Sequence, residues 1–197
     1  MRKHLLALLI TLLFSASTAW AGDIEDADAA YEKGNYAEAL RKFKIAAAQG
    51  NENAQFAIGY MYNTGQGVVQ NYEEAVRWYR MAAAKGDTVA QYNLGVKYTT
   101  GQGVVQNYAE AARWFRLATA KGFPAAQFNL GVMYGNGQGV IQDYVRAHMW
   151  LNIAAIKGYK DAAKSRDSTA AKMTSQQIAE AQKLARECLQ RNFKACD

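Results

Sequence analysis

Apolar residues in this chain recur at helical spacing, and the same arrangement returns every 36 residues. Ala90, Leu94 and Tyr98 form an i, i+4, i+8 stripe, which predicts an amphipathic helix over residues 88–99. A second helix is predicted from residue 107, with a buried face of small and aromatic side chains: Tyr108, Ala111, Trp114, Phe115 and Ala118. Each 36-residue unit is therefore predicted to be a pair of helices.

The repeat is visible in direct self-comparison. Residues 71–106 and 107–142 are identical at 23 of 36 positions without a gap. Tyrosines, glycines and tryptophans extend the register in both directions: Tyr36, Tyr72, Tyr108 and Tyr144; Gly50, Gly86, Gly122 and Gly158; Trp78, Trp114 and Trp150. One helix pair cannot bury both of its faces, so successive pairs are expected to stack into a solenoid.

Turn and capping residues mark the expected helix ends. A Gly-Gln-Gly turn at 101–103 is expected to end the first helix of its unit, because glycine adopts a positive φ without strain. Asn107, followed three residues later by Glu110, resembles a capping box at the start of the second helix. Two earlier pairs repeat this arrangement: Asn35 with Glu38, and Asn71 with Glu74.

The first 21 residues have the three-part pattern of a secretory signal peptide. Arg2 and Lys3 precede an apolar run over residues 5–14, and Ala19-Trp20-Ala21 forms a cleavage site. The run is shorter than the about 20 residues that span a bilayer. We therefore expect cleavage after Ala21, no stable membrane anchor afterwards, and a periplasmic location. The alternatives are a short anchor that is retained, and full secretion.

Composition and charge narrow the class of protein further. Half of the 197 residues are apolar and only one is proline, which suits a helical domain with a sizeable core. Removal of Arg2 and Lys3 leaves 21 basic and 17 acidic residues, a net charge of about +4. The basic residues are dispersed along the repeats and form no Lys/Arg run, which argues against a nucleic-acid partner.

The two cysteines, Cys188 and Cys196, both lie in the last ten residues. Exported proteins meet an oxidising environment, so a disulfide between them is expected. A straight helix would separate the two residues by about 12 Å, so the bond requires the helix to end near Asn192 and the tail to fold back. Two free thiols or an intermolecular bridge are the alternatives. A metal site is disfavoured, because the mature chain has a single histidine to add to two thiolates.

No pattern of residues predicts catalysis. His148 lies in the repeat position of Val76 and Ala112, which predicts a half-exposed helix residue in preference to a ligand or base. The glycine turns at 65–67, 101–103 and 137–139 lack the Lys-Ser/Thr of a phosphate-binding loop. We therefore expect no catalytic residue, cofactor or metal.

The repeat resembles a known family. Ala90, Leu94-Gly95, Tyr98, Gly101, Gly103-Val104, Tyr108, Ala111, Trp114-Phe115 and Gly122 carry the pattern of the Sel1-like repeat, a relative of the tetratricopeptide repeat. The resemblance covers about three-fifths of the mature chain. It implies an all-α fold, an α/α solenoid coiled as a right-handed superhelix. It also implies a scaffold that binds proteins or peptides, as in bacterial envelopes and the eukaryotic secretory pathway.

The register also predicts how the chain is divided. After the signal peptide (1–21), we expect a partial repeat that acts as an N-terminal cap (22–51), three full repeats (52–87, 88–123 and 124–159) and C-terminal capping helices (160–197). Lys42 occupies the tryptophan position in the partial repeat. Near the other end, Thr174 and Gln177 resemble a capping box that opens a final helix.

Partner binding is expected on first-helix positions that packing does not use, because these line the concave face of a helix-pair solenoid. The candidates are Asn53, Tyr60, Met61, Asn93, Val96, Lys97, Asn129, Val132 and Met133. Asn93 and Asn129 are one unit apart, so their amides are placed to bond an extended peptide. The alternative is that these asparagines bond to neighbouring helices. The methionines would supply adaptable apolar contact.

These observations favour an exported, monomeric, non-catalytic scaffold that binds a protein or peptide. Two other classes of function stay open. One is a secreted factor that acts on another cell. The other is an enzyme or a binder of a cell-wall-derived ligand.

Overall fold

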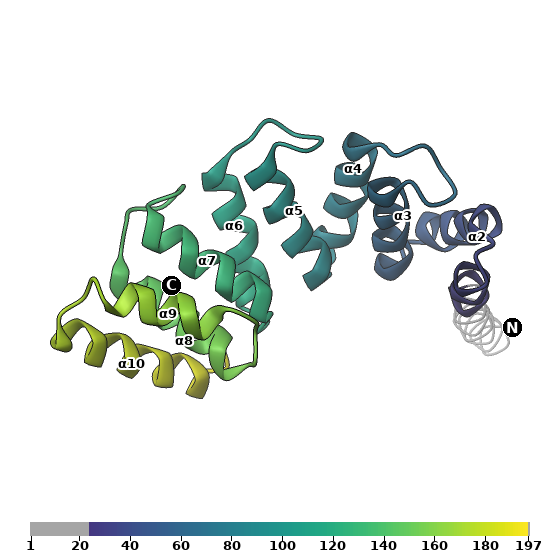
Figure 1. Ribbon diagram of the computed structural model, residues 1–197. Helices are drawn as coiled ribbons and strands as arrows, with labels where there is room; N and C mark the ends of the chain where they lie inside the picture. Colours follow the sequence, from purple (N-terminus) through teal and green to yellow (C-terminus); the bar gives the residue numbers. More distant parts are fainter. Residues whose placement is uncertain (1–23, 197) are drawn as a thin grey trace, which may run out of the picture. The chain divides into compact units, whose positions relative to one another are not determined.

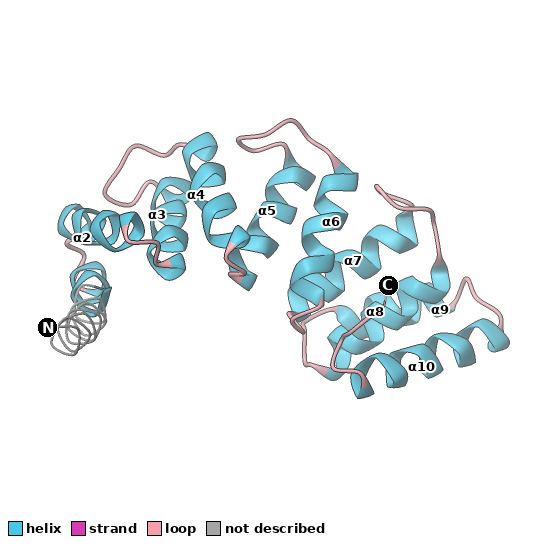
Figure 2. Cartoon of the chain, turned by 180° about the vertical axis from the view of Figure 1, so that it is seen from behind, coloured by secondary structure: helices cyan, strands magenta, loops and turns pink. Residues whose placement is uncertain are grey.

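The computed structural model describes residues 24–196, and all regular structure within that range is helical. The predicted signal peptide lies outside the described residues. A helix over residues 24–32 is followed by α2 (Tyr36–Ala48), α3 (Glu52–Thr64), α4 (Tyr72–Ala84), α5 (Thr88–Thr100), α6 (Tyr108–Thr119), α7 (Pro124–Asn136), α8 (Tyr144–Ile156), α9 (Ala162–Ala170) and α10 (Ser175–Gln190) (Figures 1 and 2). The chain divides into two compact units after Lys85, and each is described separately.

In the first unit, α3 packs against both α2 and α4. Phe43 and Ile58 are among the buried residues of its core. Gly59 allows the close contact of α3 with α4, because a Cβ atom on Gly59 would lie 2.7 Å from the ring of Tyr79. The glycine of the repeat is therefore required by packing, and a larger residue would displace the neighbouring aromatic ring.

In the second unit, consecutive helices pack on one another from α5 to α9, and α10 packs on α8. The same glycine position recurs twice: a Cβ atom on Gly95 would lie 2.5 Å from the Phe115 ring, and one on Gly131 would lie 2.8 Å from Leu151. Trp150 is buried in the core. The predicted fold class, an all-α solenoid built from helix pairs, is confirmed.

The helix ends follow the expected chemistry, with corrections at three of the predicted caps. The turn glycines Gly65, Gly101 and Gly137 end their helices at φ 77°, 75° and 66°. Asn107 accepts the backbone N–H of Glu110 at 3.0 Å, but the Glu110 carboxylate pairs with Arg113, so the capping box is incomplete. Asn71 and Glu74 behave in the same way. The predicted cap at Asn35 is wrong, because its side chain makes no capping hydrogen bond. The box of Thr174 and Gln177 is complete.

Lysines at the ends of second helices connect successive repeats. The Nζ atom of Lys85 donates to the carbonyl oxygen of Gly50 in the first unit, and Lys121 donates to Gly86 in the second. Each bond joins residues 35 apart. A basic side chain thus satisfies a carbonyl group at the preceding turn, where helix ends leave such groups without partners.

The C-terminal tail folds back as the cysteine spacing required. Cys188 and Cys196 form a disulfide with their Cα atoms 5.3 Å apart. Helix α10 ends at Gln190, and residues 192, 193 and 195 have positive φ values of 49°, 65° and 53°, which reverse the chain. The Phe193 side chain is buried as a result, and a Cβ atom on Gly122 would lie 2.7 Å from its ring.

Candidate functional site

Four of the nine predicted site residues meet in one groove of the second unit. This groove has a volume of about 300 Å³ and is bounded by α5 and α7. Val96, Asn129, Val132 and Met133 line it together with Tyr92, Thr99, Thr100, Phe115 and Gln138. Aliphatic and aromatic side chains therefore form most of the surface, with a few hydroxyl and amide groups among them. We call this site the α5–α7 groove.

Three of the predicted contact residues are corrected by their burial. Met61 is 0% exposed, Lys97 5% and Met133 4%. Met61 belongs to the core of the first unit, and Lys97 donates from Nζ to Oε1 of Gln102 at 2.9 Å. Met133 contributes only to the floor of the groove. Burial also lowers the pKa of Lys97, because it disfavours the charged ammonium form.

The remaining predicted residues lie outside the groove. Asn53 and Tyr60 are exposed on α3, in the first unit, where Tyr60 has 40% of its surface accessible. Asn93 is half-buried on α5 and does not line the groove. The predicted set therefore contains one spatial cluster on α5 and α7, together with residues from elsewhere on the chain.

Asn129 joins the two helices that bound the groove. Its side chain hydrogen-bonds to the Tyr92 hydroxyl, so for this asparagine the structure shows the alternative role of a bond to a neighbouring helix. The Tyr92 ring also packs on Phe115 and Phe123, with ring centroids 5.8 and 5.1 Å away. Burial raises the pKa of Tyr92 and nearby Tyr159 raises it further, while the Asn129 bond opposes both effects.

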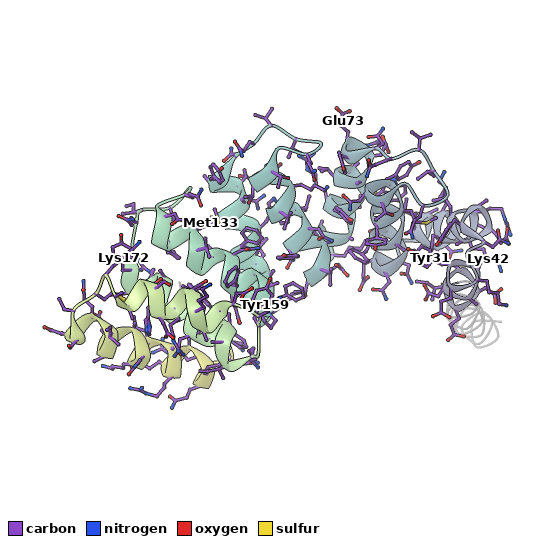
Figure 3. The ribbon with its side chains drawn as sticks, in the orientation of Figure 1. Tyr31, Lys42, Glu73, Met133, Tyr159 and Lys172 are labelled. Carbon is purple, nitrogen blue, oxygen red and sulfur yellow. A yellow bond between two sulfur atoms is a disulfide. The ribbon has the colours of Figure 1, made fainter. Side chains whose placement is uncertain are left out.

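A second cavity, of about 520 Å³, adjoins α7 on the side of α9. Its lining combines three hydroxyl residues of α9 with two lysines and a carboxylate: Ser165, Ser168, Thr169, Lys164, Lys172 and Asp161. Residues of α7 and α8 complete it: Gly131, Val132, Gly135, Asn136, Tyr144 and Leu151. We call this site the α9 pocket. Figure 3 labels Met133 on α7 and Lys172 after the end of α9.

Val132 belongs to both sites, so the α5–α7 groove and the α9 pocket flank the same helix. Reasoning from the sequence missed the α9 pocket, because the Leu-Gly and Tyr positions of the repeat are lost over residues 159–171. A signal was present nonetheless. Extension of the 36-residue register places Lys164 in the position of Phe128 and Ser168 in that of Val132.

His148 differs from its expected half-exposed state, because it is only 3% exposed. Its helix, α8, is covered by α7, α9 and α10. Burial lowers its pKa, the positive charge of Arg166 lowers it further, and Asp167 opposes them.

Within residues 24–196, no group of three or more His, Cys, Asp or Glu side chains is arranged to hold a metal ion. None of the helices in that range is long and apolar enough to cross a membrane.

Comparison with known proteins identifies the repeat. The sequence model of the Sel1 repeat matches residues 53–87, 88–123 and 124–159, more than half of the chain. A Sel1 repeat protein from Oxalobacter formigenes, known from a crystal structure, is 40% identical and has a TM-score of 0.61. That alignment covers 66% of this chain and 97% of the other. No curated protein sequence matches the chain.

A second solved structure is that of c5321, a protective antigen present in uropathogenic Escherichia coli strains that displays an SLR fold. Its identity to this chain is 27% and its TM-score is 0.63. The alignment covers 94% of this chain but 49% of the antigen, so the chain spans about half the length of that relative.

Proposed function

Because this chain belongs to the Sel1 repeat family, we propose that it is a non-catalytic scaffold that binds a protein or peptide in the α5–α7 groove. Sel1 repeat proteins generally mediate protein–protein interactions. The observation that supports this site most directly is that Val96, Asn129 and Val132 line one groove. The groove is the surface where we place the concave-face contact.

The chemistry of the groove suits an extended peptide. Val96 and Val132 offer apolar surface for a partner side chain above the buried ring of Phe115, and such apolar contact is the main source of affinity in small binding sites. Hydroxyl and amide groups of Thr99, Thr100 and Gln138 stand beside this apolar surface. The Thr99 and Thr100 hydroxyls donate to carbonyl oxygens of their own helix, so their oxygens are left to accept an N–H of an extended peptide. The Gln138 amide can in addition donate to a peptide C=O.

A matched pair of valine substitutions tests the proposal. Val96→Glu places a charge in the apolar groove, whereas Val105→Glu makes the same change at a loop residue that is 89% exposed. Both variants and the unmodified protein would be titrated into fluorescent nine-residue peptides, with binding followed by fluorescence polarisation. We expect Val96→Glu to weaken binding about ten-fold or more and Val105→Glu to leave it unchanged. Equal affinities for both variants would contradict the proposal.

We further propose that the protein acts as a monomer after export to the periplasm, with full secretion as the alternative. The pattern of residues 1–21 and the cysteine pair support export. Intact mass of the exported protein, together with cell fractionation, tests the location. A mass that retains residues 1–21 would contradict cleavage, and recovery from the medium would favour the secreted factor.

A further inference from the structure

We propose that the α9 pocket binds a carboxylate of the same peptide that occupies the α5–α7 groove, so that the ligand carries an acidic group three or four residues from an apolar one. This inference rests on the proposed function and specifies the chemistry of its partner. It is carried by the residues that α9 places in the repeat register, by the charges of the pocket and by one glycine of α7.

The buried face of α9 matches that of the first helix in a repeat, but the residue types on its open face differ. Ala162 is fully buried, as is the alanine one repeat earlier, Ala126. On the open side, Lys164 stands where that repeat has Phe128, and Ser168 stands where it has Val132. The exposed chemistry thus changes from apolar on α7 to cationic and hydroxylic on α9.

The charges of the α9 pocket favour a single negative group. Lys164 and Lys172 contribute two positive charges and Asp161 one negative charge, which leaves a net charge of +1. Among residues 24–196, neither lysine is within salt-bridge distance of a carboxylate. The Lys172 ammonium lies 5.5 Å from the centre of the Tyr144 ring, a contact that orients this side chain.

The hydroxyl groups add donors of hydrogen bonds on the same side of α9. Ser165, Ser168 and Thr169 are spaced at i, i+3 and i+4, so they project from one face of the helix. The Thr169 hydroxyl already donates to the Ser165 carbonyl at 2.9 Å. The two serine hydroxyls are placed to donate to a carboxylate, whose oxygens accept several hydrogen bonds at once.

Gly135 widens the pocket without a packing requirement. The other first helices have Asn63 and Thr99 at this position. A Cβ atom on Gly135 would meet only the Cβ atom of Ala147, at an ordinary contact distance of 3.7 Å. Glycine destabilises a helix relative to alanine, so its presence here is not explained by stability. Its effect is to leave space in the pocket.

The spacing of the ligand groups follows from the width of α7. The two sites flank this helix and share Val132. A helix with its side chains is about 10–12 Å across. An extended peptide covers that distance in about three to four residues. The carboxylate is therefore either an Asp or Glu side chain or the C-terminal group of a short segment.

A peptide library separates these possibilities. N-acetylated nine-residue peptides, randomised at each position and prepared with free or amidated C-termini, would be measured against the whole mature protein by fluorescence polarisation. We expect selection of Asp or Glu three or four positions from an apolar residue. If amidation alone abolishes binding, the carboxylate is the C-terminal one.

Charge and space in the α9 pocket are then removed separately. The double substitution Lys164→Gln with Lys172→Gln is expected to weaken the binding of acidic peptides about five- to ten-fold. The binding of the same peptides with Asn or Gln in place of the acidic residue should not change. The control, Lys33→Gln with Lys44→Gln, removes the same charge from exposed positions of the first unit. Gly135→Ala is expected to raise Tm by about 2–4 °C while it weakens the acidic peptides, which unfolding cannot explain.

The outcomes distinguish this inference from the proposed function. One outcome is that peptide binding depends on Val96 but is equal for the Lys164/Lys172 variant and the Lys33/Lys44 control. This result would overturn the carboxylate pocket and leave the groove intact. If Val96→Glu leaves peptide affinity unchanged, binding in the α5–α7 groove is contradicted, and so is the inference that rests on it. Selection of peptides without acidic residues, in both forms of the library, would also overturn the inference.

Discussion

The side chain of Asn129 on α7 hydrogen-bonds to the hydroxyl of Tyr92 on α5, and this bond connects the first helices of two successive repeats. The bond lies within the lining of the α5–α7 groove. Asn129, which its repeat position predicts to be a partner contact, thus contributes to the structure of the proposed site. Its role in partner binding and its role in stability have to be separated by experiment.

The first prediction concerns this bond. Asn129→Ala should lower the free energy of unfolding by about 1 kcal/mol, because a half-buried hydrogen bond is lost. Asn93→Ala, at the same position one repeat earlier, is the control and should change stability by less than about 0.5 kcal/mol. Urea unfolding followed by circular dichroism measures both. Equal losses for the two variants would show that the Tyr92 bond is not the cause.

A second prediction compares two glycines. Gly95→Ala should destabilise the protein by about 1–3 kcal/mol, because the new Cβ atom would lie 2.5 Å from the buried Phe115 ring. Gly135→Ala, which meets no such obstacle, should stabilise it by about 1 kcal/mol. Thermal unfolding of both variants is the measurement. The prediction is wrong if both substitutions shift Tm in the same direction.

The disulfide supplies a third prediction. Reduction, or replacement of Cys188 and Cys196 by alanine, should lower stability by about 2–3 kcal/mol, because the unfolded chain gains the freedom of a short loop. The released tail should also expose Phe193, which now packs near Gly122. Urea unfolding with and without reductant measures the loss. The double alanine variant should be insensitive to reductant, and any remaining response would point to another cause.

The fourth prediction is a pH dependence. The pKa of His148 in the folded protein lies below its unfolded value of about 6.5, because the side chain is buried and Arg166 is near. Above pH 6.5 the histidine is mostly neutral in both the folded and the unfolded protein. Below that value the unfolded protein binds a proton more readily, so the free energy of unfolding decreases as the pH falls. His148→Val copies the residue of the first full repeat, Val76, and should reduce this loss. Urea unfolding at pH 7.5 and 5.0 gives the loss of unfolding free energy between the two pH values for each protein. Equal losses for the variant and the unmodified protein would contradict the assignment.

Much of the fold was predictable because local chemistry and register agreed. The Sel1-like resemblance and the helix-pair solenoid are confirmed. Helix α5 was expected over 88–99 and runs over Thr88–Thr100. The glycine turns follow from the positive φ that glycine adopts without strain. The reversal of the tail follows from the short Cα–Cα distance that a disulfide between Cys188 and Cys196 requires. Such features depend on neighbours close in the chain.

The side of each first helix that stays open could not be predicted in the same way. Val96 and Val132 are partly exposed in the groove, whereas the next residues, Lys97 and Met133, are buried. One residue turns a side chain by about 100° around the helix axis, and the packed neighbour decides which of two adjacent positions it covers. The α9 pocket has the same origin, because it forms where α9 packs on α8 and leaves its other side facing α7.

The repeat, the order of its helices, the glycine turns and the cysteine pair could thus be predicted from the amino-acid sequence, since each depends on periodicity or on short-range conformational preference. The accessibility of the side chains, the bond of Asn129 with Tyr92 and the burial of His148 became visible in the folded protein alone. Exposure and long-range hydrogen bonds depend on how helices from different repeats approach one another. A 36-residue period locates the helices along the chain, but it does not specify which of their faces are in contact.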